Sequence, residues 1–457
     1  MDSNSPFEKP KVKLIAYTRG SEEFPYLMPD DVSTYAANAD FNELSSWELI
    51  SKDHEEGKLG KKNKVIIRES YGRGHGSVGD VAHFTFSIKG LTRAATLQLT
   101  GPTFLEHEQQ SFRRTKVKNF YIPEEIRESP LYGKITKLLE EVSELYYEML
   151  EKNIPMEDAR FCAPLLTKTN ITTTGNAREL QHLHAMNEQG EVPSYVKDVV
   201  EDIILEARKV APFLFEKYES NYETLAWYPS TQIFSSENKT IEKLVKKYGE
   251  PKDPVLVAYS SIDMDEEEID DAILNRNEAE LANLKHIHFD FLVRNSIVTN
   301  HQIRRQRTMD LSDESIYTAA ERGNIIIPPK IRNSNFEEDF EHKNRELLDL
   351  YEELVEEGVP RSESIGVIPH SLEMYTLIHV NGFNSYHFIG KRTCVEAQWE
   401  IRGIARKIAN KIKELNPKIG KYSEPQCITY GKCPEREECG YLEAYRKKHG
   451  DIRSRKS

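Results

Sequence analysis

Two stretches of the chain share one amphipathic pattern and predict two equivalent helices. Apolar residues recur at i, i+3 and i+4 through residues 194–212, and they do so again through residues 399–417. Each stretch stops at a proline, Pro212 in the first and Pro417 in the second, and these prolines are 205 positions apart. Two amphipathic helices can be aligned by chance, so the repeat needs support from other segments.

The same spacing returns in segments without a helical pattern. The identical residues found 204 or 205 positions apart are Pro164 and Pro369, Asn176 and Asn381, His182 and His387, Gln98 and Gln302, and Ser111 and Ser315. Near the start of each half, VKLIAYT from Val12 resembles VLVAYS from Val255 at a larger offset. The first half therefore contains an insertion, which lies between Tyr17 and His83. A nearly constant offset through such different segments predicts one domain repeated in tandem.

Each repeat combines strand and helix patterns. Residues 83–90 and 286–293 alternate apolar and polar side chains, which predicts half-buried strands. Residues 135–152 and 336–357 are rich in Glu and Lys and predict long surface helices. A Lys-, Pro- and Gly-containing stretch between Tyr222 and Pro254 predicts a linker.

These patterns predict an α+β protein of two tandem domains. The boundaries that we predict are residues 1–235 for copy one, 250–420 for copy two and 421–457 for a cysteine-containing tail.

The second copy contains a dense group of arginines. Arg304, Arg305 and Arg307 stand within four positions, and burial of so much positive charge requires an anion. Arg392 comes shortly before the second amphipathic helix, from where a guanidinium can reach a cleft. Guanidinium groups bind phosphate bidentately and stay charged, so an anionic ligand is one interpretation. A solvated charge cluster is the other.

Longer motifs around these residues resemble the flavin-dependent thymidylate synthases. Copy one contains GHGSVGDVAHFTFSI, QLTGPTFLEHEQQSFRR, ARFCAP and TTGNARELQHL, and copy two contains QIRRQRTMDLSDES and RTCVEAQWEIR. Their order is similar to the family order of GH-x-S, R-H-R-x(7)-S-x-R, A-R-x-x-L-P and N-x-R-x-L-x-H, with a late Arg before A-Q-W-E-I-R. The resemblance covers most of both copies. It implies that each domain is an antiparallel sheet packed with long helices and that the two domains form a pseudo-dimer.

Each copy has lost a different part of this pattern. Copy one has Gly101, Pro102 and Thr103 in place of R-H-R and Asn187 in place of the late Arg, and it keeps Ser111, Arg113 and Arg160. Copy two has Tyr317 and Ile365 in place of two family arginines, and it keeps Gln302, Arg305, Arg307 and Arg392. In the family the nucleotide site is built across a subunit interface, and the residues kept by the two copies belong to its opposite sides. The resemblance therefore implies an asymmetric pseudo-dimer with one hybrid site, the alternative being two copies that degenerated independently.

The resemblance implies reductive methylation of dUMP to dTMP with FAD, NADPH as reductant and methylene-tetrahydrofolate or a related pterin as one-carbon donor. Arg392 would be the catalytic residue that polarises the uracil ring. The residues that would bind the substrate are Ser111, Arg113, Arg160, Gln302 and Arg305. The residues that would contact FAD are His75, Ser77, Asp80, Arg305, Gln306, Arg307, Asn381 and His387, with Asn176, Arg178 and His182 as alternatives at the ring. A flavin enzyme for another nucleotide, and a non-catalytic nucleotide- or flavin-binding scaffold, are the competing interpretations.

Composition limits the partners and the compartment. The 457 residues carry a net charge of −13, which argues against non-specific nucleic-acid or membrane binding. We expect neither a membrane span nor a signal peptide, because the chain has no long apolar run and its start, MDSNSPFEKPKVK, is polar. Five cysteines in this length favour a reducing cytoplasm. By analogy with the homotetrameric family, we expect a homodimer that assembles four domains.

Three cysteines follow the last predicted core helix. Cys427, Cys433 and Cys439 are spaced C-x5-C-x5-C, and cysteines on a loop can bind zinc or an iron–sulfur cluster. Zinc sites usually have a shorter C-x(2–4)-C spacing, and a fourth ligand is not evident, so we predict no metal here. Cys162 beside Arg160 is expected to pack in the core, whereas Cys394 beside Arg392 has no assigned role.

Overall fold

The computed structural model describes residues 6–216, 228–450 and 452, which divide into two compact units. Unit 1 contains Met1–Ser236, Ser315–Gly323 and Ile327–His370, and unit 2 contains Glu237–Glu314, Asn324–Ile326 and Ser371–Ser457. A large helical part of copy two thus belongs to the same compact unit as copy one. The boundaries assigned from sequence, 1–235, 250–420 and 421–457, remain predictions about the repeat.

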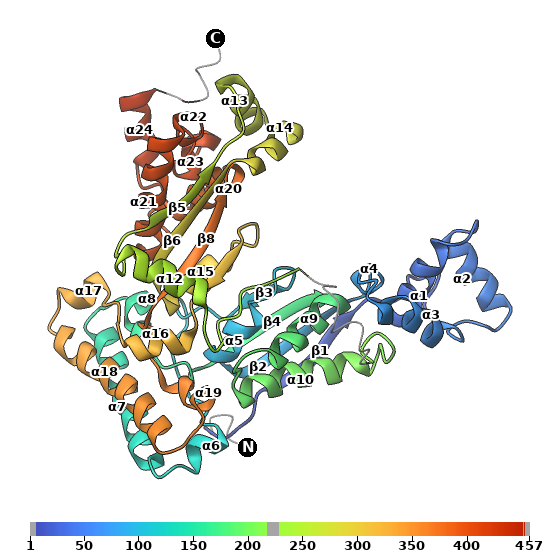
Figure 1. The fold of residues 1–457 in the computed structure, drawn as a ribbon, viewed down its shortest axis with the longest axis horizontal. Helices are drawn as coiled ribbons and strands as arrows, with labels where there is room; N and C mark the ends of the chain where they lie inside the picture. Colours follow the sequence, from blue (N-terminus) through green and yellow to red (C-terminus); the bar gives the residue numbers. More distant parts are fainter. Residues whose placement is uncertain (1–5, 217–227, 451, 453–457) are drawn as a thin grey trace. The chain divides into compact units, whose positions relative to one another are not determined.

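The sheet of unit 1 is antiparallel, as expected. Its strands are β1 (Lys11–Tyr17), β2 (His83–Thr92), β4 (Lys168–Asn176) and β3 (Glu106–Gln109), in that spatial order. The amphipathic helix α10 (Ser194–Arg208) packs against β1 and β2 with the apolar face that its periodicity predicted (Figure 1). Helices α5 (Arg93–Leu99) and α9 (Ala177–Glu188) follow β2 and β4 directly.

The sheet of unit 2 repeats this topology. Its strands are β5 (Val255–Ser260), β6 (His288–Ser296), β8 (Glu373–Asn381) and β7 (Leu311–Asp313), again all antiparallel. Helix α21 (Trp399–Leu415) packs against β6 as α10 does against β2. Helices α15 (Ile297–Ile303) and α20 (Gly382–Arg392) correspond to α5 and α9. The equal strand orders confirm the α+β class with two antiparallel sheets.

Both long surface helices lie in unit 1. Helix α7 (Tyr132–Glu151) belongs to copy one and α18 (Glu337–Glu356) to copy two, and they pack against each other (Figure 1). Lys343 Nζ on α18 contacts Glu141 of α7 at 2.6 Å and Glu346 of its own helix at 2.7 Å. Glu141 and Glu346 are repeat counterparts, so one lysine bridges the same position of both copies.

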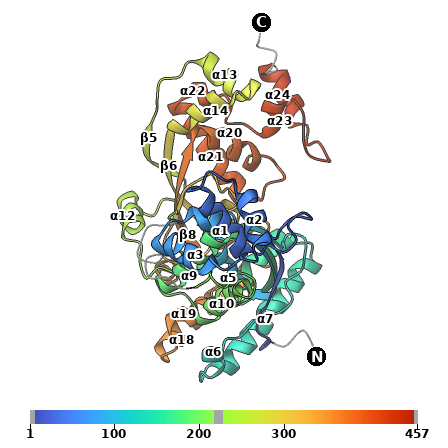
Figure 2. The ribbon, with the colours of Figure 1, turned by 90° about the vertical axis from the view of Figure 1, so that its right-hand side faces the viewer.

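The insertion predicted between Tyr17 and His83 forms a small helical group. Helices α1 (Pro29–Ala39), α2 (Ser46–Glu55) and α3 (Asn63–Glu69) pack together around Leu27, Tyr35, Leu49 and Ile50 (Figure 2). The shorter helices are η1 (Tyr71–Arg73), α4 (Ser77–Asp80), α6 (Glu124–Arg127), α8 (Met156–Ala159), η2 (Arg160–Cys162), α13 (Glu266–Asn275), α14 (Glu278–Asn283), η3 (Leu284–His286), α16 (Ile316–Arg322), α17 (Pro329–Arg332), α19 (Arg361–Ser364), η4 (Ile365–Val367), α22 (Pro417–Gly420), α23 (Gln426–Tyr430) and α24 (Tyr441–His449).

The segment predicted as a linker between Tyr222 and Pro254 contains a helix. Its start at Tyr222 lies outside the described residues, and its later part contains the helix α12 (Lys239–Tyr248). Ile241 and Val245, four positions apart, bury one face of α12 against Leu292 and Tyr375. Gly249 ends the helix in the left-handed conformation, φ 66°, which favours glycine. Among the described residues, no helix is long and apolar enough to cross a membrane.

Candidate functional site

Glu157 brings together the two predicted phosphate-binding arginines of copy one. The side chain of Arg113 donates from Nε to Glu157 Oε2 at 2.9 Å, and Arg160 donates from Nε to the backbone carbonyl of Glu157 at 3.2 Å. Arg113 is exposed in the loop after β3, whereas Arg160 begins η2 and is buried. Ser111 is exposed, and its Oγ accepts a hydrogen bond from the Arg113 backbone at 3.3 Å. The structure therefore places all three residues in one neighbourhood.

A third arginine, which the sequence motifs did not single out, belongs to the same neighbourhood. Arg93, the first residue of α5, is 6 % exposed and lies over the ring of Phe112 at 5.2 Å. Burial, followed by the charge of Arg160, lowers its pKa to about 9. Among the described residues, Arg93 has no carboxylate partner, although buried cations normally have one.

Arg93 instead donates to a neutral histidine from copy two. Its Nε lies 3.2 Å from Nε2 of His370, and His370 Nδ1 lies 2.5 Å from the backbone carbonyl of Ala163. Because Nδ1 faces an acceptor and Nε2 faces a donor, the ring carries its proton on Nδ1. Burial is the main reason that the pKa of His370 is lowered to about 3, and the positive charge of Arg93 contributes to this shift. The repeat counterparts of Arg93 and His370 are the apolar residues Ile297 and Leu165.

The residues predicted to contact the cofactor in copy one converge on Asp80. Arg178 Nη1 donates to Asp80 Oδ2 at 3.1 Å, and Asn176 Nδ2 donates to Asp80 Oδ1 at 3.2 Å. Asn176 also caps α9 by accepting from the backbone of Glu179 at 2.9 Å. His75 and Ser77, in the preceding turn and at the start of α4, have exposed side chains.

In unit 2, the predicted catalytic arginine lies against the predicted substrate-binding glutamine. Arg392, the last residue of α20, donates from Nη2 to the backbone carbonyl of Gln302 at 3.1 Å. In copy one the counterpart pair is also in contact, since Gln98 Nε2 donates to Asn187 Oδ1 at 3.2 Å. Equivalent positions thus meet in both copies, but only copy two has a cation there.

Buried polar groups of the A-Q-W-E-I-R segment hold the helix that carries Gln302. Glu400 accepts from the backbone and hydroxyl of Ser296, at 2.7 and 2.6 Å, and from Thr299 Oγ1 at 2.8 Å. Ser296 is the N-cap of α15, and Gln398 caps α21 by accepting from the backbone of Glu400 at 3.0 Å. Burial raises the pKa of Glu400, and its hydrogen bonds oppose this shift. Part of the motif therefore has a structural role, because Glu400 connects α15 to α21 through buried hydrogen bonds.

The three clustered arginines of copy two have different surroundings. Arg304 is buried and forms an ion pair with buried Asp313, Nη2 to Oδ2 at 2.6 Å. Arg305 and Arg307 are exposed. The anion required for burial is thus internal for Arg304, whereas Arg305 and Arg307 present their charges at the surface.

Gln306, which stands where the family has histidine, belongs to a polar chain with two predicted cofactor residues. Its Nε2 lies 2.8 Å from His387 Nδ1 and donates to Thr308 Oγ1 at 2.9 Å. Thr308 donates to Asn384 Oδ1 at 2.7 Å, and the backbone of Asn384 donates to Asn381 Oδ1 at 2.9 Å. Asn381 is the N-cap of α20, as Asn176 is of α9. Burial lowers the pKa of His387, and the positive charges of Lys391 and Arg392 contribute to the same shift.

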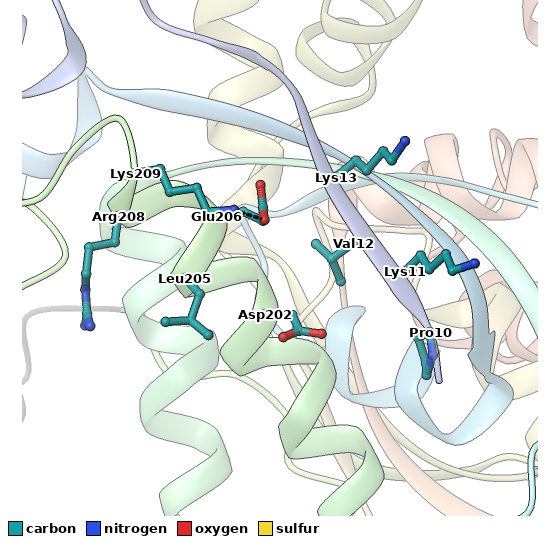
Figure 3. A pocket seen from close by; sticks show the side chains of 9 residues that line it. All are labelled: Pro10, Lys11, Val12, Lys13, Asp202, Leu205, Glu206, Arg208 and Lys209. Carbon is teal, nitrogen blue, oxygen red and sulfur yellow. Dashed lines mark hydrogen bonds and ion pairs between the residues drawn. The ribbon is translucent and has the colours of Figure 1, made fainter. Parts of the chain in front are cut away.

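A surface pocket of about 710 Å³ lies elsewhere on unit 1 (Figure 3). It is formed by β1 and the end of α10, and its charged lining consists of Lys11, Lys13, Asp202, Glu206, Arg208 and Lys209. Lys209 pairs with Glu206 across one turn of α10. The residues predicted from the motifs do not line this pocket.

Comparison with known proteins agrees with the motifs. The family model described as "Thymidylate synthase complementing protein" matches residues 13–213 and again residues 235–418. The flavin-dependent thymidylate synthase of Thermococcus onnurineus is 31% identical over 207 residues, 44% of this chain and 79% of that protein. Those of Saccharolobus solfataricus and Pyrococcus abyssi are 32% identical over 180 residues and 33% identical over 183 residues. These matches cover 38% of this chain in both cases, and 68% and 70% of the relatives.

A solved structure, the UMP/dUMP methylase PolB from Streptomyces cacaoi bound with 5-Br dUMP, is 18% identical with a TM-score of 0.37 and covers 49% of this chain and 99% of that chain. These relatives each match less than half of this chain, whereas the family model matches it twice. The resemblance stated from the motifs is confirmed. The chain belongs to the thymidylate synthase complementing protein family, and its two halves each match that family.

Proposed function

We propose that this protein is a flavin-dependent thymidylate synthase that methylates dUMP to dTMP. The observation that carries the proposal is the contact of Arg392 with the backbone of Gln302, at 3.1 Å. A guanidinium held at this position can stabilise negative charge that develops on a pyrimidine carbonyl. The counterpart contact in copy one, between Gln98 and Asn187, has no cation and cannot do so.

Arg113 and Arg160 are proposed to bind the nucleotide phosphate. Their Nε atoms are held by Glu157, which fixes the direction of both guanidinium groups. The third guanidinium, Arg93, adds positive charge that no carboxylate of the described residues neutralises. A phosphate dianion suits this group because several guanidinium groups can bind it at once.

We further propose that one hybrid site combines residues of both copies. Copy one would supply Ser111, Arg113 and Arg160, and copy two would supply Gln302, Arg305 and Arg392. The proposal rests on which residues each copy has kept, because independent decay would not respect the two sides of a single site. It is supported by the contacts Gln98–Asn187 and Gln302–Arg392. These contacts join equivalent positions in each copy, as the alignment of the two copies requires.

FAD is the proposed cofactor, with NADPH as reductant and methylene-tetrahydrofolate or a related pterin as one-carbon donor. The donor set fits a dinucleotide: Arg305 and Arg307 are exposed cations suited to a diphosphate, and Gln306, His387 and Asn381 offer polar groups for a ring. Copy one adds the exposed side chains of His75 and Ser77 beside Asp80. When bound, the reduced flavin would supply the hydride. A homodimer of four domains in the cytoplasm completes the proposal.

The test uses the purified full-length protein. We expect a yellow protein that binds FAD and releases tritium from 5-tritiated dUMP when reductant and methylene-tetrahydrofolate are present. A colourless protein that takes up no FAD contradicts any flavin function, and a flavoprotein that releases no tritium contradicts dUMP as the substrate.

The hybrid site is tested by two variants, Arg113→Ala and Arg392→Ala. Each is expected to abolish dUMP binding. Mixing them restores little activity if one chain supplies both sides, and a substantial fraction if two chains do. Full nucleotide binding by either variant alone contradicts the hybrid site.

A further inference from the structure

Four of the five cysteines belong to unit 2, and the fold gathers them around one helix pair. Cys394 follows the end of α20, Cys427 lies in α23, and Cys433 and Cys439 lie between α23 and α24. The fifth, Cys162, is fully buried in unit 1. The sequence alone left the C-x5-C-x5-C run without a fourth ligand. The tertiary structure supplies a candidate in Cys394, which stands more than thirty positions before the run.

Packing of α20 against α23 brings Cys394 and Cys427 into one neighbourhood. A Cβ atom placed on Gly390 of α20 would lie 3.6 Å from Cα of Gln426, so the two helices touch at their backbones. Cys427 is buried in the apolar cluster of unit 2, and Cys433 packs against the same cluster. Cys439 is exposed in the loop that follows.

The electrostatics of the thiols show the same proximity. Cys433, Cys394 and Cys439 all lie near enough to Cys427 to act on it electrostatically. Cys433 and Cys439 likewise lie near Cys394. Four neighbouring cysteines have the chemistry to bind a metal ion, which takes cysteine as thiolate.

We propose that Cys394, Cys427, Cys433 and Cys439 form a metal centre with four thiolate ligands. Zinc and iron–sulfur clusters are the centres that four cysteines hold in proteins. Among the described residues, the side chains do not stand in the geometry of a formed metal site. Closing the site therefore requires the thiols to turn towards one another, and Cys433 is half-buried and Cys439 exposed. This inference is independent of the proposed enzyme activity.

A metal centre here would fasten the tail to the segment that carries Arg392. Cys394 is two positions after Arg392, and Arg406 of α21 holds the intervening Thr393 through its backbone carbonyl at 3.4 Å. Cys427, Cys433 and Cys439 all lie in the tail, residues 421–457. Shared metal ligation by Cys394 and the tail cysteines would restrain the C-terminal end of α20, which carries the side chain of Arg392.

The test measures metal in the full-length protein purified under anaerobic conditions. We expect one equivalent of zinc per chain, or iron with acid-labile sulfide and a broad brown absorbance beyond that of flavin. Cys394→Ser is expected to lose most of this metal, although Cys394 lies outside the spaced run. The matched control is Cys162→Ala, the one cysteine outside the cluster, which should keep the full metal content.

Replacement of the metal by Co²⁺ covers the case in which Cys394→Ser folds poorly. Thiolate-to-cobalt charge transfer in the otherwise unchanged protein should have the intensity of four thiolates. Wild-type protein without stoichiometric zinc or iron overturns the proposal. Full metal content in Cys394→Ser overturns it too, as does a disulfide within the cluster in anaerobically purified protein.

Discussion

Pro164 and Pro369, which occupy the same position in the two copies, pair with each other in an antiparallel bridge. The flanking hydrogen bonds are reciprocal: Leu165 N donates to Ile368 O at 3.0 Å, and His370 N donates to Ala163 O at 2.9 Å. Exchanging each residue for its counterpart turns one bond into the other. Such reciprocity is the mark of an isologous contact, so within unit 1 the two copies meet as two identical subunits do.

The side chains around this bridge are no longer reciprocal, and Glu363 gives a first prediction. Glu363 of copy two accepts from the backbone of Ser194 at 2.7 Å and from its hydroxyl at 2.9 Å, at the start of α10 in copy one. Glu363→Ala removes the acceptor of the Ser194 backbone N–H and leaves the hydroxyl with Glu125 Oε1, at 3.5 Å. The free energy of unfolding in urea should fall by about 1–2 kcal/mol. The control Glu352→Ala, at an exposed position of α18, should change it by less than about 0.5 kcal/mol; equal effects would contradict the capping role.

His370 should make unit 1 sensitive to acid. Its pKa is lowered from 6.5 to about 3, so the native state favours the neutral ring more than the unfolded chain does. Its contribution to stability is therefore complete above pH 6.5 and is lost as the pH falls towards 3. The loss amounts to about 1.4 kcal/mol per pH unit. Urea unfolding measured between pH 7.5 and pH 5 should show this slope.

Two variants isolate the histidine. His370→Leu should be less stable than wild type at pH 7.5, because Arg93 Nε loses its acceptor, and the difference should shrink on acidification. Adding Arg93→Ile, which gives both positions their counterparts' side chains, should recover part of the loss. His342→Gln, at an exposed position of α18, should keep the wild-type pH dependence. A constant difference between His370→Leu and wild type at all pH values would exclude this titration.

Neighbouring arginines should respond differently to substitution. Asp313→Ala removes the buried carboxylate that pairs with Arg304 and accepts from Asn300 and Thr376, which should cost about 3–5 kcal/mol in unfolding free energy. Arg305→Ala, at an exposed position, should leave stability within about 0.5 kcal/mol of wild type while weakening dUMP binding. Isothermal titration beside urea unfolding separates the two effects. Loss of stability in Arg305→Ala would mean that its role is structural.

The counterpart pair Arg392 and Asn187 tests the division of labour between the copies. Arg392→Ala should lower the rate of tritium release at a fixed dUMP concentration by at least about 100-fold, the usual effect of losing a group that stabilises transition-state charge. Asn187→Ala removes the equivalent side chain in copy one and should change this rate less than about threefold, because no cation is lost. Comparable losses in both variants would show that both copies support catalysis.

Local patterns in the sequence were sufficient for the repeat and for six of its main elements. The helices α10 and α21 and the strands β2 and β6 were predicted from periodicity, which reports the buried face of each element directly. The long helices α7 and α18 were predicted from their Glu and Lys content. The constant offset also paired Gln98 with Gln302 and Asn187 with Arg392, and both counterpart contacts exist in the structure. Helix α12 was read as part of the linker, although Ile241 and Val245 carry a short amphipathic signal.

Tertiary structure decided which charged and polar groups are buried and with what. Sequence shows three adjacent arginines, but only the fold pairs Arg304 with Asp313 and leaves Arg305 exposed. The Arg93–His370 contact joins residues 277 positions apart, and Cys394 joins the tail cysteines through the packing of α20 on α23. Burial and pairing depend on what other segments bring to the same place, and side-chain periodicity along one segment carries no information about those partners.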